Sequence, residues 1–192
     1  MPKISMPKKL VVIVGLPGSG KSTVAEFIKK EFNADIVHSG DIIREEVKRR
    51  GLEYTPENDA IIADWFNATE EGERLLVQRV WNKIKESEKD LIVVEGFRAT
   101  ENIKILEEIA KIKPFVIAVT ASFNVRVQRE LKRGRFGKEE SKKYLKLREE
   151  QEKGHGVEDL IECAGYTIDN SELSIEETNA KISKIIKGIL IK

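Results

Sequence analysis

Residues 10–22 read LVVIVGLPGSGKS, and this stretch decides the fold class. Its first five residues are apolar and predict a buried strand. Residues 15–22 then match the pattern G-x-x-x-x-G-K-[ST] without a mismatch, and a helical pattern of apolar residues follows at once. In such a loop the glycines let backbone N–H groups turn toward phosphate oxygens, which also face the positive N-terminus of the helix. The stretch therefore predicts a strand, a phosphate-binding loop (P-loop) and a helix within an α/β domain.

The polar side chains around this loop have separate expected roles. Lys21 is expected to contact the β- and γ-phosphates of a nucleoside triphosphate, and the Ser22 hydroxyl to ligate Mg²⁺. Glu95 follows another apolar run and supplies the acid that triphosphate sites place at a neighbouring strand end. The sequence thus predicts ATP and Mg²⁺ as cofactors. The loop residues expected at the nucleotide are Gly15, Pro17, Gly18, Ser19, Gly20, Lys21, Ser22 and Thr23.

Apolar runs of strand length recur along the chain, at 10–14, 35–37, 91–94, 115–119 and 166–168. Helical periodicity fills the stretches between them, as in 24–28, 42–47, 103–110 and 175–190. Strands that alternate with helices predict right-handed βαβ units and a parallel sheet covered on both faces. No internal repeat or low-complexity linker interrupts the alternation, so residues 1–192 are interpreted as a single domain.

Two segments depart from the alternation. Residues 51–72 carry Pro56 and the pair Trp65 and Phe66, which we expect to pack beneath a flap. Residues 133–156 contain four glycines among many Lys, Arg and Glu residues. Each segment is a candidate mobile flap over a site. Within the second, residues 138–153 favour a charged helix with i,i+4 pairs such as Glu139 with Lys143.

Composition and charge exclude several classes of protein. Of 192 residues, 40% are hydrophobic and 35% charged, which is typical of a globular chain. A net charge of +1 gives no reason to expect a nucleic-acid partner, and no apolar stretch approaches membrane-spanning length. The single cysteine, Cys163, excludes an internal disulfide and suits a reducing compartment. We therefore expect a cytoplasmic monomer or homodimer that binds small molecules.

Short motifs beyond the P-loop resemble those of nucleoside monophosphate kinases, adenylate kinases in particular. Residues 39–44 (SGDIIR) are similar to the segment that leads to an arginine on the acceptor phosphate. Residues 95–98 (EGFR) resemble Asp-Gly-Phe-Pro-Arg, whose arginine also holds the acceptor. Asn102 falls where those enzymes carry a glutamine that reads the acceptor base. The resemblance implies an acceptor segment at 39–88, with contacts from Ser39, Asp41, Arg44, Gly96, Arg98 and Asn102.

The resemblance also implies a lid at residues 133–156. Arg129 and Arg133 resemble the arginines at the entry to the adenylate kinase lid, and Arg148 is a candidate lid arginine. Independently of the resemblance, phosphoryl transfer needs compensation of negative charge, and arginine suits this because its guanidinium binds phosphate in bidentate fashion. Together with Lys21, the catalytic candidates are therefore Arg98, Arg129, Arg133 and Arg148.

The last third of the chain is more similar to dephospho-coenzyme A kinases. Residues 164–170 (AGYTIDN) resemble their Ala-Asp-Tyr-x-Ile-x-Asn strand, which places Asn170 near the donor adenine. Over about residues 10–190, the pattern most resembles a small archaeal group described as adenylate-kinase-related or dephospho-coenzyme A kinase-like. The resemblance implies a three-layer α/β/α P-loop fold with a five-stranded parallel sheet in the order 2-3-1-4-5.

The sequence departs from the adenylate kinase pattern on the acceptor side. Glu95 replaces the usual Asp, no proline precedes Arg98, and residues 52–73 contain no arginine. These departures affect the identity of the acceptor and leave the donor site intact.

Three functions therefore stay open. The first is an ATP-dependent phosphotransferase that moves the γ-phosphoryl group to a nucleoside monophosphate such as AMP. The second is a dephospho-coenzyme A kinase that phosphorylates a ribose hydroxyl. The third is a regulatory switch NTPase, although the guanine-reading string Asn-Lys-x-Asp that such switches usually carry is absent; the closest match, residues 82–85 (NKIK), lacks the Asp. We favour the first.

Overall fold

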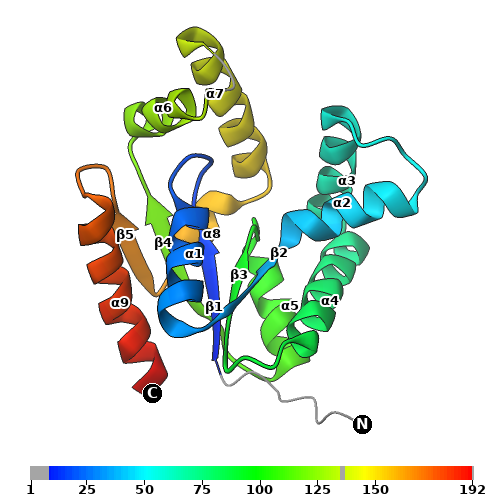
Figure 1. Cartoon of the computed structure of the whole chain (residues 1–192). Coiled ribbons are helices and arrows are strands. Elements are labelled where there is room, and N and C mark those ends of the chain that lie inside the picture. Colours follow the sequence, from blue (N-terminus) through cyan, green and yellow to red (C-terminus); the bar gives the residue numbers. More distant parts are fainter. Residues whose placement is uncertain (1–8, 135–136, 192) are drawn as a thin grey trace.

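A computed structural model describes residues 9–134 and 137–191 and contains an all-parallel five-stranded sheet (Figure 1). The strand order is β2-β3-β1-β4-β5, as expected from the resemblance. The strands are β1 (Lys9–Val14), β2 (Asp35–His38), β3 (Leu91–Glu95), β4 (Phe115–Thr120) and β5 (Tyr166–Asp169). All five predicted strands are confirmed, with ends that differ by one residue at most.

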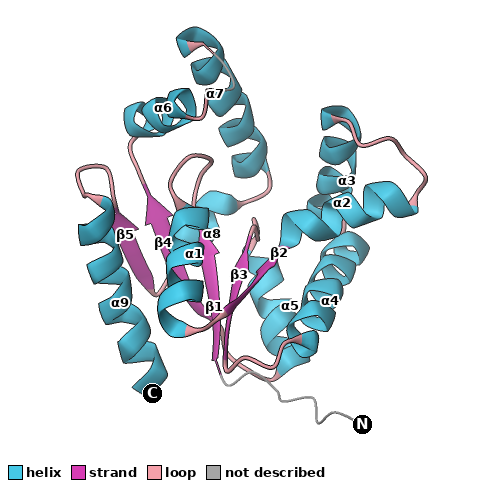
Figure 2. Ribbon diagram, viewed as in Figure 1, coloured by secondary structure: helices cyan, strands magenta, loops and turns pink. Residues whose placement is uncertain are grey.

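Helices cover both faces of the sheet (Figure 2). Side chains alternate across β1, so Leu10, Val12 and Val14 enter one core and Val11 and Ile13 the other. The first core is shared with α4, α5 and α8, and the second with α1 and α9. The helices are α1 (Lys21–Phe32), α2 (Ser39–Arg49), α3 (Pro56–Ala68), α4 (Glu70–Glu86), α5 (Thr100–Ala110), α6 (Phe123–Lys132), α7 (Lys138–Gly154), α8 (Val157–Glu162) and α9 (Ile175–Ile191). Among the residues that the structure describes, no helix has the length and hydrophobicity needed to cross a membrane.

The first irregular segment of the sequence is largely helical. The Thr55 side chain caps α3 by accepting a hydrogen bond from the Asn58 backbone N–H, and Thr69 caps α4 in the same way through Gly72. A Cβ at Gly72 would lie 2.2 Å from the Trp65 carbonyl oxygen, so only glycine fits where α4 begins. Phe66 is completely buried in the first core. Helices α2 and α3 project on one side of the carboxyl end of the sheet (Figure 1).

The second irregular segment contains α7, which lies with α6 beyond the carboxyl ends of the strands and next to the P-loop (Figure 1). The prediction of a charged helix over 138–153 is confirmed. Its first ion pair joins Glu139 to Lys142, at 3.0 Å and i,i+3 spacing, rather than to the predicted Lys143. Helix α7 packs against α6 and continues into α8, so the segment returns to the core after passing over the loop.

Candidate nucleotide and phosphate site

The P-loop has a backbone conformation that requires its glycines. Gly15, Gly18 and Gly20 all have positive φ angles, of 150°, 79° and 101°. A Cβ at Gly15 would lie 2.1 Å from the Val119 carbonyl oxygen, because the loop turns directly over the end of β4. The Ser19 hydroxyl is buried and has no hydrogen-bond partner among the described residues. A loop with these positive φ angles and a buried hydroxyl without a partner fits phosphate binding, because its backbone N–H groups can turn toward an anion.

The Lys21 side chain is hydrogen-bonded to the backbone of the P-loop. Its Nζ donates hydrogen bonds to the carbonyl oxygens of Gly15, at 2.6 Å, and Leu16, at 3.0 Å. Burial lowers the pKa of the Lys21 ammonium, and the carboxylates of Glu152 and Glu95 oppose that shift. Lys21 is therefore a desolvated cation at the loop, where an arriving phosphate would gain a strong interaction.

Ser22, Glu95 and His38 form a chain of contacts at the ends of β2 and β3. The Ser22 hydroxyl donates to Oε1 of Glu95 at 2.7 Å, and Nδ1 of His38 lies 3.2 Å from Oε2 of Glu95. Burial acts to raise the pKa of the Glu95 carboxyl, but hydrogen bonds with His38 and Ser22 hold this pKa below its ordinary value. The hydrogen bond with Glu95 raises the pKa of the His38 imidazole. A hydroxyl next to an ionised carboxylate is an oxygen donor set that suits Mg²⁺, so Ser22 and Glu95 fit the expected metal.

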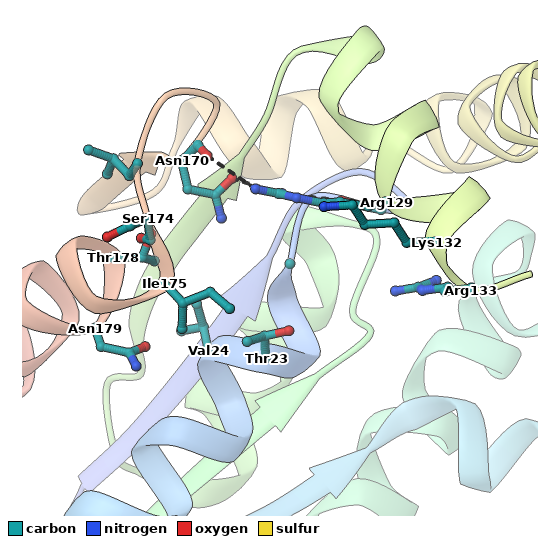
Figure 3. A pocket seen from close by; sticks show the side chains of 13 residues that line it. Thr23, Val24, Arg129, Lys132, Arg133, Asn170, Ser174, Ile175, Thr178 and Asn179 are labelled. Atoms are coloured by element: carbon teal, nitrogen blue, oxygen red, sulfur yellow. Dashed lines mark hydrogen bonds between the residues drawn. The ribbon is translucent and has the colours of Figure 1, made fainter.

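A cavity of about 380 Å³ lies between the start of α1, helix α6 and the loop that joins β5 to α9 (Figure 3). Arg129 crosses one side and donates to the Ser19 carbonyl oxygen and to Oδ1 of Asn170, each at 3.0 Å. Asn170 returns a hydrogen bond from Nδ2 to the same Ser19 carbonyl at 3.0 Å. Thus Arg129 and Asn170 join the P-loop to β5, and the structure brings these two predicted residues together. The cavity is lined by Gly18, Gly20, Thr23, Val24, Arg129, Lys132, Arg133, Asn170, Leu173, Ser174, Ile175, Thr178 and Asn179.

A second cavity of about 280 Å³ is lined by Glu95 and by residues that follow the ends of β2 and β3. A Cβ at Gly96 would lie 2.4 Å from the Ser39 hydroxyl, and Gly96 has a positive φ of 103°, so glycine allows the loop after β3 to approach the start of α2. Arg44 enters from α2 and is hydrogen-bonded to Asp41. Four of the six residues predicted to hold an acceptor line this cavity, namely Ser39, Arg44, Gly96 and Arg98. The other lining residues are His38, Gly40 and Glu95.

Two of the residues predicted to contact an acceptor, Asn102 and Asp41, do not line the second cavity. Asn102 is fully buried, and its Oδ1 accepts hydrogen bonds from the backbone N–H groups of Arg98 and Ala99, each at 3.3 Å. It therefore supports the Arg98 loop and does not line the second cavity. Asp41 lies inside the first turn of α2 and is hydrogen-bonded to Arg44, which does line that cavity. Arg133 lines the first cavity, where it is exposed and forms an ion pair with Glu130 at 3.2 Å.

The sequence reasoning missed Arg126, which is 3% exposed. Its guanidinium donates to the carbonyl oxygen of Pro17 in the P-loop, at 3.3 Å, and to Glu149 of α7, at 2.6 Å. It therefore connects α7 to the loop. Its spacing from Arg129 and Arg133, i+3 and i+7 on one helix face, was the available signal.

The fold and the site together define a P-loop protein, with a phosphate-binding loop at the carboxyl edge of a parallel sheet. Comparisons agree with this class. A family model described as an AAA domain matches residues 14–146. The chain resembles a solved shikimate kinase from Acinetobacter baumannii in complex with shikimate, with a TM-score of 0.55, 18% identity, and 98% of this chain and 97% of that chain covered. It also resembles TT1252 from Thermus thermophilus, with a TM-score of 0.62, 17% identity, and 95% and 98% covered.

Relatives in sequence are archaeal proteins. The UPF0200 protein of Hyperthermus butylicus is 32% identical over 180 residues, with 94% of each chain covered. The UPF0200 protein of Aeropyrum pernix is 35% identical over 169 residues, with 88% of each covered. The chain belongs to the UPF0200 family of P-loop proteins and contains its AAA-type domain.

Proposed function

We propose that this protein is an ATP-dependent phosphotransferase that transfers the γ-phosphoryl group of ATP to a nucleoside monophosphate such as AMP. The observation that carries the proposal is the position of Glu95. Its carboxylate accepts a hydrogen bond from Ser22 of the P-loop, yet the same residue lines the second cavity with Arg44 and Arg98. A donor phosphate on the loop and an acceptor phosphate in that cavity would therefore meet beside Glu95.

Different residues of the chain would have different roles in such a transfer. Lys21 supplies positive charge to the β- and γ-phosphates once phosphate oxygens replace the carbonyls of Gly15 and Leu16. Arg98 and Arg148 supply charge on the acceptor and lid sides, where negative charge spreads over the transferring group. Ser22 and Glu95 would hold Mg²⁺, which neutralises phosphate charge when bound. We further propose that 39–88 is the acceptor segment and that 133–156 is a lid that excludes water.

A dephospho-coenzyme A kinase is the second candidate, and Asp41 favours it. This carboxylate is half-exposed in the first turn of α2. It forms an ion pair with Arg44, and Arg44 lines the second cavity. A hydroxyl acceptor would need a carboxylate to take its proton, whereas a phosphate oxygen is already ionised and would not.

The experiment that tests the proposal uses ATP with a radiolabelled γ-phosphate, in the presence of Mg²⁺. It measures transfer of this phosphate to AMP, to other nucleoside monophosphates and to dephospho-coenzyme A. We expect labelled ADP from AMP, and no transfer by a folded Lys21→Ala variant, which lacks the cation nearest the moving group. Lys30→Ala removes an exposed lysine from the same helix and should behave as wild type. Slow hydrolysis that is indifferent to every acceptor would instead identify a switch NTPase.

A further inference from the structure

The carboxylate of Glu152 lies between two guanidinium groups that come from different segments. It is 3.4 Å from Arg148, one turn earlier on α7, and 3.9 Å from Arg98, in the loop after β3. Only 11% of the Glu152 side chain is exposed, although a glutamate at this position on a charged surface helix would normally face solvent. The sequence gives no sign of this, because Glu152 is one of four acids among residues 149–158.

Two arginines this close repel each other, and water screens the repulsion poorly here. The Arg98 side chain is 17% exposed. Burial lowers the pKa of Arg98, the charge of Arg148 acts in the same direction, and Glu152 opposes both. Burial lowers the pKa of the Lys21 ammonium of the P-loop, and the charge of Glu152 opposes that shift as well. One carboxylate therefore compensates three cations that come from the P-loop, the β3–α5 loop and α7.

The Glu152 carboxylate and the two guanidinium groups connect the second cavity to helix α7. Arg98 lines the second cavity together with Glu95, and it also lines a smaller cavity with Arg148 and Glu152 beneath α7. The same end of α7 contacts α3, where Nε2 of His155 lies 2.9 Å from Asp64. The arginine of the proposed acceptor site is thus connected to the proposed lid through Glu152.

We propose that Glu152 is a positioning residue, whose carboxylate holds the guanidinium groups of Arg98 and Arg148 together between donor and acceptor. This inference rests on the proposed function. Without the carboxylate, Arg148, which is 32% exposed, can turn to solvent, and Arg98 loses the neighbour that offsets its burial. Charge compensation of the transferring group depends on both guanidinium groups being preorganised.

A purely structural role for Glu152 makes a different prediction. As an i,i+4 partner of Arg148, it would contribute only slightly to α7, and its loss would lower stability and all activities to a similar small extent. If Glu152 is instead a positioning residue, its loss should lower turnover without weakening nucleotide binding. Removing a negative charge from an anion site does not weaken the binding of a triphosphate, whereas misplaced arginines slow the transfer.

The test compares Glu152→Gln with Glu150→Gln, which removes an exposed acid from the same helix. For Glu152→Gln we expect kcat to fall about tenfold or more, while the affinity for a non-hydrolysable ATP analogue stays within about threefold of wild type or increases. Glu150→Gln should match wild type in both. Glu152→Asp keeps the charge on a shorter side chain, so it should recover part of kcat and replaces Glu152→Gln if that variant does not fold.

A second readout needs no acceptor. The Nε–Hε signals of Arg98 and Arg148, assigned with Arg→Lys variants, should report restrained side chains in the ligand-free wild type and in Glu150→Gln, and mobile ones in Glu152→Gln. Unchanged mobility of Arg98 and Arg148 in Glu152→Gln, or unchanged kcat, would overturn the inference. If the wild type transfers to no acceptor, the proposed function fails, and arginine mobility together with acceptor-independent ATP hydrolysis still decides the role of Glu152.

Discussion

The Ser22 hydroxyl donates a hydrogen bond to Oε1 of Glu95 at 2.7 Å, although the two residues are 73 positions apart in the sequence. They meet because β1 and β3 are parallel neighbours, with Ile13 opposite Glu95, and the P-loop follows β1 directly. Ligands of open α/β folds bind at this carboxyl edge of the sheet. The contact joins the two side chains that we propose to bind Mg²⁺.

From this contact we predict that Glu95→Gln weakens Mg²⁺ binding in the presence of ATP by about 10–100-fold, because the amide removes the ionised oxygen beside Ser22. Titration of Mg²⁺ at constant ATP measures the effect. Glu88→Gln, at an exposed position before β3, serves as the matched control. A Glu95→Gln protein with the Mg²⁺ dependence of wild type would show that this pair does not form the metal site.

The arginines of the second cavity should serve the acceptor. Arg44→Ala and Arg98→Ala are each expected to cost about 2–4 kcal/mol in kcat/KM for the acceptor, with little change in ATP affinity. Steady-state kinetics at varied AMP, together with direct ATP binding, separates the two effects. Lys48→Ala removes an exposed cation from the same helix as Arg44 and is the control. An equal loss of ATP affinity would place the arginines on the donor side.

Asp41 distinguishes the two candidate acceptors. With AMP as acceptor, Asp41→Asn should stay within about tenfold of wild type, since a phosphate oxygen needs no general base and the amide oxygen can still bond Arg44. A ribose hydroxyl must lose a proton, and a positioned base typically contributes about 10²–10⁴-fold to that step. A loss of about 10³-fold in folded Asp41→Asn, with phosphorylation of dephospho-coenzyme A by wild type, would reverse the choice of acceptor.

Glu46 should make stability depend on acid pH. Its fully buried carboxylate accepts hydrogen bonds from Arg49, Arg50 and Arg79, and these hold the pKa of Glu46 far below its ordinary value, with Arg49 contributing most. A carboxyl group whose pKa is lower in the folded than in the unfolded state stabilises the protein at pH values above the unfolded-state pKa. This stabilisation is lost as the pH falls toward the folded-state pKa.

We therefore expect Glu46→Gln to lower the free energy of unfolding by about 3 kcal/mol at pH 7, because three guanidinium groups lose their shared anion. The difference from wild type should shrink steadily below about pH 4 as the wild-type carboxylate becomes protonated. Urea unfolding of both proteins between pH 2 and pH 7 measures it. Glu45→Gln, which alters a more exposed pair with Lys83, is the control. A difference that is constant with pH would contradict the role of the carboxylate charge.

Several features of the site could be predicted because they depend on local chemistry. The positive φ angles of Gly15, Gly18 and Gly20 follow from a motif whose residues are adjacent, and the strands follow from apolar runs that are buried on both faces. The resemblance to nucleoside monophosphate kinases assigned Arg44 and Arg98 to one acceptor site, and both residues line the second cavity at the carboxyl edge of the sheet.

What the sequence by itself determined was therefore the fold class, the P-loop and the edge of the sheet at which polar residues gather, since backbone geometry and apolar periodicity are local properties. Only the tertiary structure decided that Glu152 faces Arg98, that Arg126 connects Glu149 to the P-loop, and that Asn102 supports a loop from within the core. These contacts depend on how α6, α7 and α5 are rotated and packed against the sheet. Many exposed and buried arrangements of a charged helix share one sequence pattern, and packing against distant segments selects among them.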